Sequence, residues 1–204
     1  MPRPFTQLFT IGHSNQSQSE FLDTLRAHGI KRLIDVRSKP YSKFVPHFNR
    51  ESLQRAVRGV AMEYLFLGDQ LGAHEREPEC YVDGRISYVR AARTKSFAQG
   101  LHRLLTAAAQ TRSALMCAEQ DPLHCHRGLL ICRHLSCEDV DVQHILRDGR
   151  IESQAKFQQR LLDVAGLGDD DFINQLVPRS QRLASAYAQV ASDPENREND
   201  GKTT

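Results

Sequence analysis

The sequence predicts an α/β fold: a three-layer, Rossmann-like domain with a mostly parallel sheet and a helical C-terminal extension. Short apolar runs alternate with amphipathic helical segments over residues 1–150, which is typical of parallel strands joined by crossover helices. The chain also has 204 residues, of which 40% are hydrophobic, and this is enough to bury one core. We therefore expect an α/β domain over residues 1–150, a helical extension packed on it over residues 151–192, and a disordered polar tail over residues 193–204.

Five apolar runs predict the strands, because each run ends at a glycine, a proline or a polar residue. The first run ends at Gly12, the second gives way to a loop containing Pro40, and the third is closed by Gly68. The expected strands are residues 8–11, 30–36, 62–67, 114–117 and 140–146.

Between these runs, apolar residues recur at helical spacing. The expected helices are residues 21–28, a segment that begins at residue 49, residues 97–108 and residues 127–135. Residues 73–85 are polar and contain Pro78, so we expect a long surface loop there. Beyond Arg150 the pattern is helical until Pro178 interrupts it. These last helices are expected to cover the sheet or to reach a partner.

The composition argues against a membrane protein. No run of about 18 apolar residues is present to span a bilayer. Residues 1–14 lack the apolar stretch and cleavage site of a signal peptide. Five cysteines without a C-x-x-C pair are expected to stay reduced. We therefore expect a cytoplasmic protein without a membrane partner, and a homo-oligomer is compatible with the sequence.

Polar side chains follow three of the expected strands, at the point where each strand ends. They are His13 and Ser14 after the first strand, Asp35 and Arg37 at the end of the second, and Glu119 after the fourth. Carboxyl ends of parallel neighbours share one edge of a sheet, so these side chains should meet in a ligand-binding crevice. Glu119 is the candidate general acid or base, and His13 is a candidate to share proton transfer. Each residue taken singly also has a structural explanation, as a turn cap, a helix N-cap or a support for the loop.

A Cys125-His126-Arg127 triplet opens the expected helix of residues 127–135. Free backbone N–H groups at a helix start favour a thiolate, so Cys125 is a candidate nucleophile and His126 another candidate for proton transfer. The alternative is that Cys125 only packs at the junction. The loop is not that of a cysteine phosphatase, because the residue six positions after Cys125 is Ile131 rather than arginine.

Arg127 is a candidate anion ligand, since its guanidinium can bind two oxygens from the helix start. The alternative is an arginine paired with Glu119 or Asp121 that fixes the loop, and the two roles are compatible.

A basic segment with interleaved aromatic residues follows the second expected strand. Residues 37–58 include six Lys or Arg and a single acid. Cations of this kind bind phosphate oxygens, and exposed aromatic rings stack on bases. The alternative is a solvated helix face with aromatic rings turned into the core. The candidate ligand-binding side chains are Arg37, Tyr41, Lys43, Phe44 and Phe48, and Tyr64 on the third strand is a further candidate.

A zinc site is not favoured by the spacing of the cysteines. Cys117, Cys125 and His126 would have to combine with Cys132 or His134. Structural zinc usually takes its ligands from C-x(2–4)-C knuckles, whereas seven residues separate Cys117 from Cys125. The sequence therefore predicts no cofactor, and a metal is the less favoured alternative.

Taken in order, five motifs resemble the prokaryotic domain of unknown function 488 family. They are TIGHS at residues 10–14, LIDVRSKPYSKF at 33–44, MEYLFLGDQLG at 62–72, LMCAEQDPLHCHR at 115–127 and VQHILRDG at 142–149. The resemblance implies an α/β Rossmann-like domain and supplies no established reaction. The signature positions that it implies are His13, Ser14, Asp35, Arg37, Cys117, Glu119, Cys125, His126 and Arg127.

The segment LIDVRS, residues 33–38, also resembles the opening of a rhodanese domain. In a rhodanese a later strand delivers a cysteine directly into a loop ahead of a helix. Here residues 119–124 intervene before Cys125, so the likeness is partial.

These observations favour an enzyme that acts on a phosphate-bearing substrate, either a nucleotide or a nucleic acid. Arg37 and Arg127 would hold the anion and Glu119 would transfer the proton. One alternative is a rhodanese-like, thiol-dependent transferase that uses Cys125. Another is a nucleic-acid-binding module without catalysis.

Overall fold

A six-stranded sheet forms the centre of the computed structural model, which describes residues 6–73, 78–135 and 140–193. The strand order is β3-β2-β6-β1-β7-β8, and the first five of these strands are parallel. β8 pairs with β7 in the antiparallel direction. The strands are β1 (Thr6–Gly12), β2 (Arg32–Asp35), β3 (Glu63–Phe66), β6 (Ser113–Cys117), β7 (Val140–Ile145) and β8 (Ile151–Ser153). The expected α/β fold with a mostly parallel sheet is therefore confirmed.

Helices cover both faces of the sheet. On one face, α1 (Gln18–Ala27) and α2 (Arg50–Gly59) pack through a cluster that includes Phe21 and Leu53. α1 begins at a capping box in which Ser17 and Glu20 satisfy each other's backbone N–H groups. The other face is covered by α5 (Lys95–Gln110), a π-helical turn (Arg127–Cys132) and α6 (Arg133–Leu135). The remaining short elements are a 3-10 turn (Pro46–Phe48), α3 (Gly68–Leu71), a 3-10 turn (Pro78–Cys80), α4 (Tyr88–Ala91) and a 3-10 turn (Pro122–His124).

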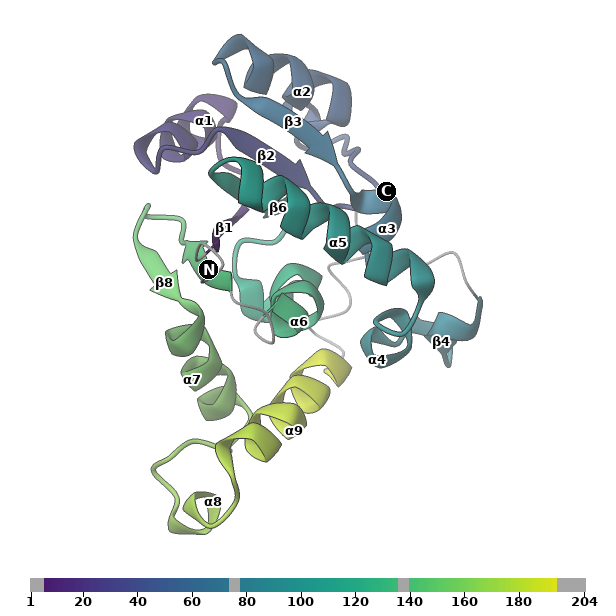
Figure 1. Cartoon of the computed structure of the whole chain (residues 1–204), viewed down its shortest axis with the longest axis vertical. Helices are drawn as coiled ribbons and strands as arrows, with labels where there is room; N and C mark the ends of the chain where they lie inside the picture. The colour runs from purple at the N-terminus through teal and green to yellow at the C-terminus, as the bar shows by residue number, and fades with distance from the viewer. Residues whose placement is uncertain (1–5, 74–77, 136–139, 194–204) are drawn as a thin grey trace, which may run out of the picture.

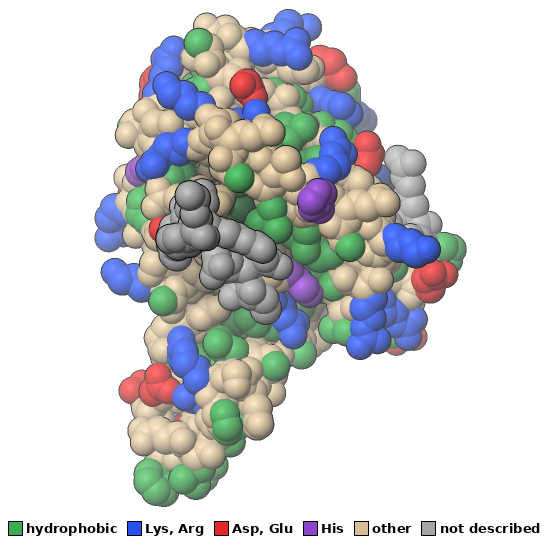
Figure 2. All heavy atoms as spheres, viewed as in Figure 1, with side chains coloured by type: hydrophobic (Ala, Val, Ile, Leu, Met, Phe, Trp, Pro, Cys, Tyr) green, Lys and Arg blue, Asp and Glu red, His purple; other side chains and the backbone are tan. Residues whose placement is uncertain are grey.

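The C-terminal extension forms an arm at the end of the molecule away from α1 and α2 (Figure 1). It consists of α7 (Gln154–Val164), α8 (Phe172–Gln175) and α9 (Arg179–Ser192). α7 and α9 share a third apolar cluster, which also includes Leu123 from the loop after β6. Arg160 ties α7 to that loop, since it donates hydrogen bonds to Asp121 at 2.6 and 3.0 Å. The tip of the arm is apolar and exposed (Figure 2): Phe172, Ile173 and Leu176 are 73%, 69% and 70% exposed.

Two segments differ from the sequence-based expectation. The chain after Arg150 does not begin as a helix, because residues 151–153 first extend the sheet as β8. The expected surface loop over residues 73–85 contains a hairpin, β4 (Tyr81–Val82) and β5 (Arg85–Ile86). Its turn places Asp83 at φ 50° and Gly84 at φ 73°, and Asp-Gly is the residue pair that favours such a turn.

Parts of other predictions lie outside the described residues. These are residues 74–77 of the expected loop and residues 194–204 of the expected tail. Within the described ranges, no helix combines the length and the apolar character needed to cross a membrane. The described cysteines are free and buried, as expected of reduced thiols: Cys80, Cys117, Cys125 and Cys132.

Candidate functional site

The strand order brings the polar residues that follow β1, β2 and β6 to one edge of the sheet. β6 lies between β1 and β2. In the register of these strands, Gly12 lies opposite Cys117, and Asp35 lies opposite Met116. The carboxyl ends of the three strands therefore coincide. This is the edge at which open α/β sheets bind ligands.

The loops after β1 and β6 are in direct contact. The backbone N–H of His13 donates to the carbonyl of Cys117 at 3.0 Å, and that of Ser14 donates to the carbonyl of Ala118 at 2.8 Å. A β-carbon at position 12 would overlap the carbonyl oxygen of Glu119, so only glycine fits there. Ser14 has a φ of 46°, which is uncommon for a residue with a side chain.

Arg37 and Asp35 form a buried ion pair at this edge. Nε of Arg37 donates to Oδ1 of Asp35 at 3.0 Å, and Nη2 donates to Oδ2 at 2.6 Å. The hydroxyl of Tyr64, on β3, donates to the same Oδ2 at 2.6 Å. Burial alone would lower the pKa of Arg37, but the Asp35 carboxylate outweighs burial and the pKa is raised. Burial and the same carboxylate raise the pKa of Tyr64, so the phenol stays protonated.

His13 holds the other side of the Arg37 guanidinium. Its Nε2 lies 3.1 Å from Nη1 of Arg37, and its Nδ1 lies 2.8 Å from the carbonyl oxygen of Ser14. Nδ1 therefore carries the hydrogen, while Nε2 accepts from the guanidinium. Burial and the charge of Arg37 lower the pKa of His13 to about 3. The ring also stacks on Phe48, with centroids 4.3 Å apart and an interplanar angle of 22°.

The guanidinium of Arg37 keeps hydrogen-bond donors for a ligand. A guanidinium has five N–H groups. Among the described residues, Asp35 accepts from two of them and His13 from a third, which leaves one on each terminal nitrogen. The side chain is 8% exposed, so these donors are held in a fixed direction and can bind an anion oxygen.

The basic segment after β2 presents two aromatic rings to solvent. Tyr41 is 61% exposed and Phe44 is 80% exposed, and Lys43 between them is also exposed. The loop is held in place, since the backbone N–H of Ser42 donates to Oδ1 of Asn49 at 2.7 Å. Phe48, the third aromatic candidate of this segment, is instead buried against His13.

Cys125 is buried, with 1% exposure, between Cys117 and His126. Burial, together with the Cys117 thiol, raises the pKa of Cys125 well above its usual value. This opposes the thiolate that a helix start would favour. Nδ1 of His126 faces both sulfur atoms, at 3.5 Å from Sγ of Cys117 and 4.0 Å from Sγ of Cys125.

Arg127 is fully buried and its terminal nitrogens donate to backbone carbonyls of the loop after β6. Nη1 donates to the carbonyl of Glu119, and Nη2 donates to that of Gln120 at 2.6 Å. These contacts fix the loop. The sequence suggested that Arg127 pairs with the carboxylate of Glu119 or Asp121. Its observed acceptors are backbone carbonyls instead, and the Asp121 carboxylate pairs with Arg160. Glu119 itself is partly exposed, two residues beyond the end of β6.

The residues that follow β1, β2 and β6 thus lie at one edge of the sheet, and Tyr41 and Lys43 lie farther along the loop after β2. The densest contacts at this edge join Asp35, Arg37 and His13, and Tyr64 belongs to the same group. The contact that the sequence did not reveal is the ring stack between His13 and Phe48. The signal in the sequence is weak: Pro46 begins the turn that contains Phe48, and Asn49 ends it. The catalytic and ligand-binding roles of these residues stay predictions.

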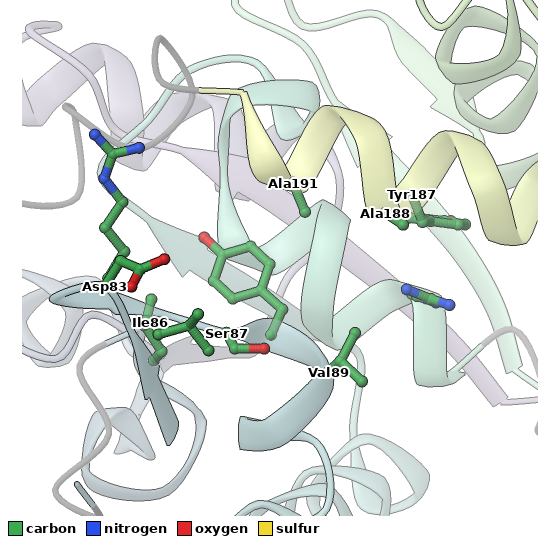
Figure 3. Close-up of a pocket in the computed structure, with 11 residues that line it drawn as sticks. Asp83, Ile86, Ser87, Val89, Tyr187, Ala188 and Ala191 are labelled. Atoms are coloured by element: carbon green, nitrogen blue, oxygen red, sulfur yellow. The ribbon is translucent and has the colours of Figure 1, made fainter. Parts of the chain in front are cut away.

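A separate hollow of about 470 Å³ lies between the β4–β5 hairpin, α4 and α9 (Figure 3). Asp83, Ser87 and Tyr187 are among its lining residues. None of the residues predicted for the site lines this hollow.

These features define an α/β protein of the Rossmann-like class, with polar side chains gathered at the carboxyl ends of neighbouring parallel strands. The chain belongs to the family described as domain of unknown function DUF488, whose family model matches residues 17–133. The resemblance found in the sequence is therefore confirmed. The match includes Asp35, Arg37 and Cys125, and it leaves His13 and Ser14 outside. No curated protein and no solved structure matches the chain significantly.

Proposed function

We propose that this protein is an enzyme that acts on a phosphate-bearing substrate, a nucleotide or a nucleic acid, at the carboxyl ends of β1, β2 and β6. The observation that carries the proposal is the combination of a fixed arginine with exposed aromatic rings on one loop. Arg37 keeps two donors for an anion oxygen. Tyr41 and Phe44 follow it within the same loop and are 61% and 80% exposed.

The two kinds of side chain match the two parts of a nucleotide. The guanidinium of Arg37 binds phosphate oxygens, and the ammonium of Lys43 adds attraction for a phosphate backbone. Tyr41 and Phe44 stack on bases, which gives affinity without strong sequence preference. Lys39 and Lys43 lie on the same loop as these two rings, and this combination of cations and rings supports a ligand-binding role.

Proton transfer is assigned to Glu119, because its carboxylate is partly exposed at the same edge. His13 is neutral and both of its nitrogens are engaged, so it serves here as a positioning residue for Arg37. Ser14 and Asp35 act in the same way, through the loop backbone and the ion pair. Arg127 supports the loop that carries Glu119.

A nucleic-acid-binding module without catalysis is the second candidate, because the exposed rings and lysines would serve binding alone. A thiol-dependent transferase is less well supported, since Cys125 is 1% exposed and its pKa is raised. The role of Glu119 separates the first two candidates.

The test is a binding screen followed by an activity screen. Fluorescence anisotropy with labelled single-stranded DNA and RNA, and calorimetry with nucleotides, should detect binding by the intact chain. Phe44→Ala and Tyr41→Ala should each weaken oligonucleotide binding by about 1–3 kcal/mol. Phe172→Ala, which removes an equally exposed ring on α8, is the matched control and should change nothing.

Glu119→Gln then distinguishes an enzyme from a binding module. For an enzyme, it should abolish conversion of the bound oligonucleotide or nucleotide while leaving its affinity within about twofold. Unchanged binding in both loop variants would refute the phosphate-ligand proposal. Binding without conversion by the unmodified chain would support the second candidate instead.

A further inference from the structure

Three metal-binding atoms converge beneath the candidate site. The sulfur atoms of Cys117 and Cys125 and a ring nitrogen of His126 all lie within 4.8 Å of one another. The three residues come from the end of β6 and from the junction that opens the π-helical turn. The spacing of these residues in the sequence does not favour a zinc site, but the fold brings their side chains close together in space.

The separations match those around a tetrahedral zinc ion. Zinc binds sulfur at about 2.3 Å and nitrogen at about 2.0–2.1 Å, so a tetrahedral angle places the two atoms about 3.6 Å apart. Nδ1 of His126 lies 3.5 Å from Sγ of Cys117 and 4.0 Å from Sγ of Cys125. Both sulfur-to-nitrogen separations are therefore within about 0.4 Å of the value expected around a tetrahedral zinc ion.

His126 is oriented as a metal ligand. Its Nε2 lies 3.1 Å from the carbonyl oxygen of Val36, at the end of β2. That nitrogen therefore donates its hydrogen to the backbone, and the lone pair of Nδ1 points toward the two sulfur atoms. A backbone carbonyl on the far nitrogen is the usual support of a zinc-binding imidazole, because it fixes the tautomer and the ring.

The surroundings also suit a soft divalent ion. Cys117, Cys125 and His126 are 4%, 1% and 2% exposed, and both cysteines belong to the apolar cluster on this face of the sheet. Two thiolates would neutralise the charge of a divalent ion, so the metal with its ligands carries no net charge into the core. Loss of the thiol protons on binding makes the affinity depend on pH.

We propose that Cys117, Cys125 and His126 bind one zinc ion, with a small ligand such as water in the fourth position. The three ligands are not among the residues assigned to phosphate binding, so the zinc proposal can be tested separately from it. Zinc there would hold the end of β6, the loop of Glu119 and the π-helical turn together. Thiolate and imidazole ligands favour zinc over magnesium or calcium.

The test uses the full chain, kept reduced and purified without chelator. Metal analysis should find about one zinc per chain, the stoichiometry of a single three-ligand site. After removal of the zinc, addition of Co²⁺ should produce thiolate-to-cobalt charge-transfer absorption and the visible bands of a tetrahedral ion. Competition with a chromogenic chelator then gives the affinity for Zn²⁺.

Variants with matched controls identify the ligands. Cys117→Ser and Cys125→Ser should weaken zinc binding by at least about 100-fold, beyond the loss typical of an outer hydrogen-bond partner. Cys132→Ser and Cys80→Ser are the controls, because both cysteines are fully buried and lie outside the three-residue cluster. Their cobalt spectra and zinc affinities should match those of the unmodified chain.

A measurement on the unmodified chain guards against variants that fail to fold. Zinc should raise the melting temperature of the metal-free protein, and a chelator should reverse the rise. The proposal is overturned if the metal-free chain gives no tetrahedral cobalt spectrum. It is overturned equally if Cys125→Ser retains the spectrum, or if zinc leaves the melting temperature unchanged.

Discussion

His13 and Arg37 are joined by a hydrogen bond of 3.1 Å in which the neutral imidazole accepts from the guanidinium. The contact links the end of β1 to the end of β2 across the strand that separates them. It also excludes a proton from His13, because a protonated ring would place a second cation against Arg37. Both the geometry and the charge of the site therefore depend on His13 remaining neutral.

Stability should decline with acid because of two buried histidines. Burial is the main cause that lowers the pKa of both His13 and His144 from 6.5 to about 3. The unfolded chain takes up protons below pH 6.5 that the folded chain refuses. Above pH 6.5 the two histidines therefore do not lower the free energy of unfolding. Between pH 6.5 and about pH 3, each histidine lowers it by up to about 1.4 kcal/mol for every pH unit.

Urea denaturation at several pH values between 7 and 4 measures this slope. His144→Gln should flatten it, and His102→Gln should not, since His102 is exposed. An equal slope in the His144→Gln variant would show that this ring titrates normally in the folded protein.

Removing the charge of Arg37 should lower the free energy of unfolding much more than removing the charge of an exposed arginine. Asp35 is fully buried, so Arg37→Met leaves a carboxylate without its counter-charge. We expect the free energy of unfolding to fall by about 3–5 kcal/mol. Tyr64→Phe removes one hydrogen bond to the same carboxylate and should cost about 1.5–3 kcal/mol.

The control is Arg26→Met, because Arg26 pairs with Asp23 on the surface, where the side chains are 54% and 64% exposed. Its effect should stay within about 1 kcal/mol. Similar losses in the Arg37→Met and Arg26→Met variants, measured by urea denaturation, would contradict the buried ion pair.

Two glycines should respond oppositely to alanine. Gly12→Ala forces a β-carbon into the carbonyl of Glu119, and this should lower the free energy of unfolding by about 1–3 kcal/mol or more. Gly59→Ala, in the last turn of α2, meets no atom within 4 Å and should raise it by up to about 1 kcal/mol. Thermal melts of both variants provide the comparison. A Gly12→Ala variant as stable as the unmodified chain would show that the two loops separate easily.

The proposed oligonucleotide binding should weaken with salt. Each cation that contacts a phosphate releases a counterion, so Lys43→Gln should reduce the slope of log Kd against log salt by about 0.7 for a single strand. Lys156→Gln, on α7, is the control and should leave the slope unchanged. Anisotropy titrations at several salt concentrations measure both. If the Lys43→Gln variant has the same slope as the unmodified chain, then Lys43 does not contact the phosphate backbone of the oligonucleotide.

The sequence was sufficient to predict the meeting of His13, Asp35 and Arg37, because parallel strands that end in polar residues share one edge. It was not sufficient to predict the strand order. The apolar runs of β1, β2 and β6 are chemically alike, and nothing in them specifies which strand lies in the middle. The hairpin of β4 and β5 was predictable from Asp83-Gly84, whereas the three residues of β8 are too few for a pattern.

Cys125 shows where local rules reach their limit. The start of a helix favours a thiolate, and this is all that the neighbouring sequence reveals. The protonation state is instead determined by burial and by Cys117, which is eight residues away in the chain and adjacent in the fold. The partners of Arg127 were also not predictable from the sequence. They are backbone carbonyls, and no pattern of side chains specifies the path of the backbone in this loop.

The strand order also determines when the sheet can form during synthesis of the chain. β1 and β2 are synthesised first, but β6 must lie between them. Until residues 113–117 are available, β1 has no partner strand and one edge of β2 is unpaired. Open strand edges in a nascent chain invite pairing with other chains. The sheet edge that carries the contact between His13 and Arg37 can therefore be completed only after residues 113–117 have been made.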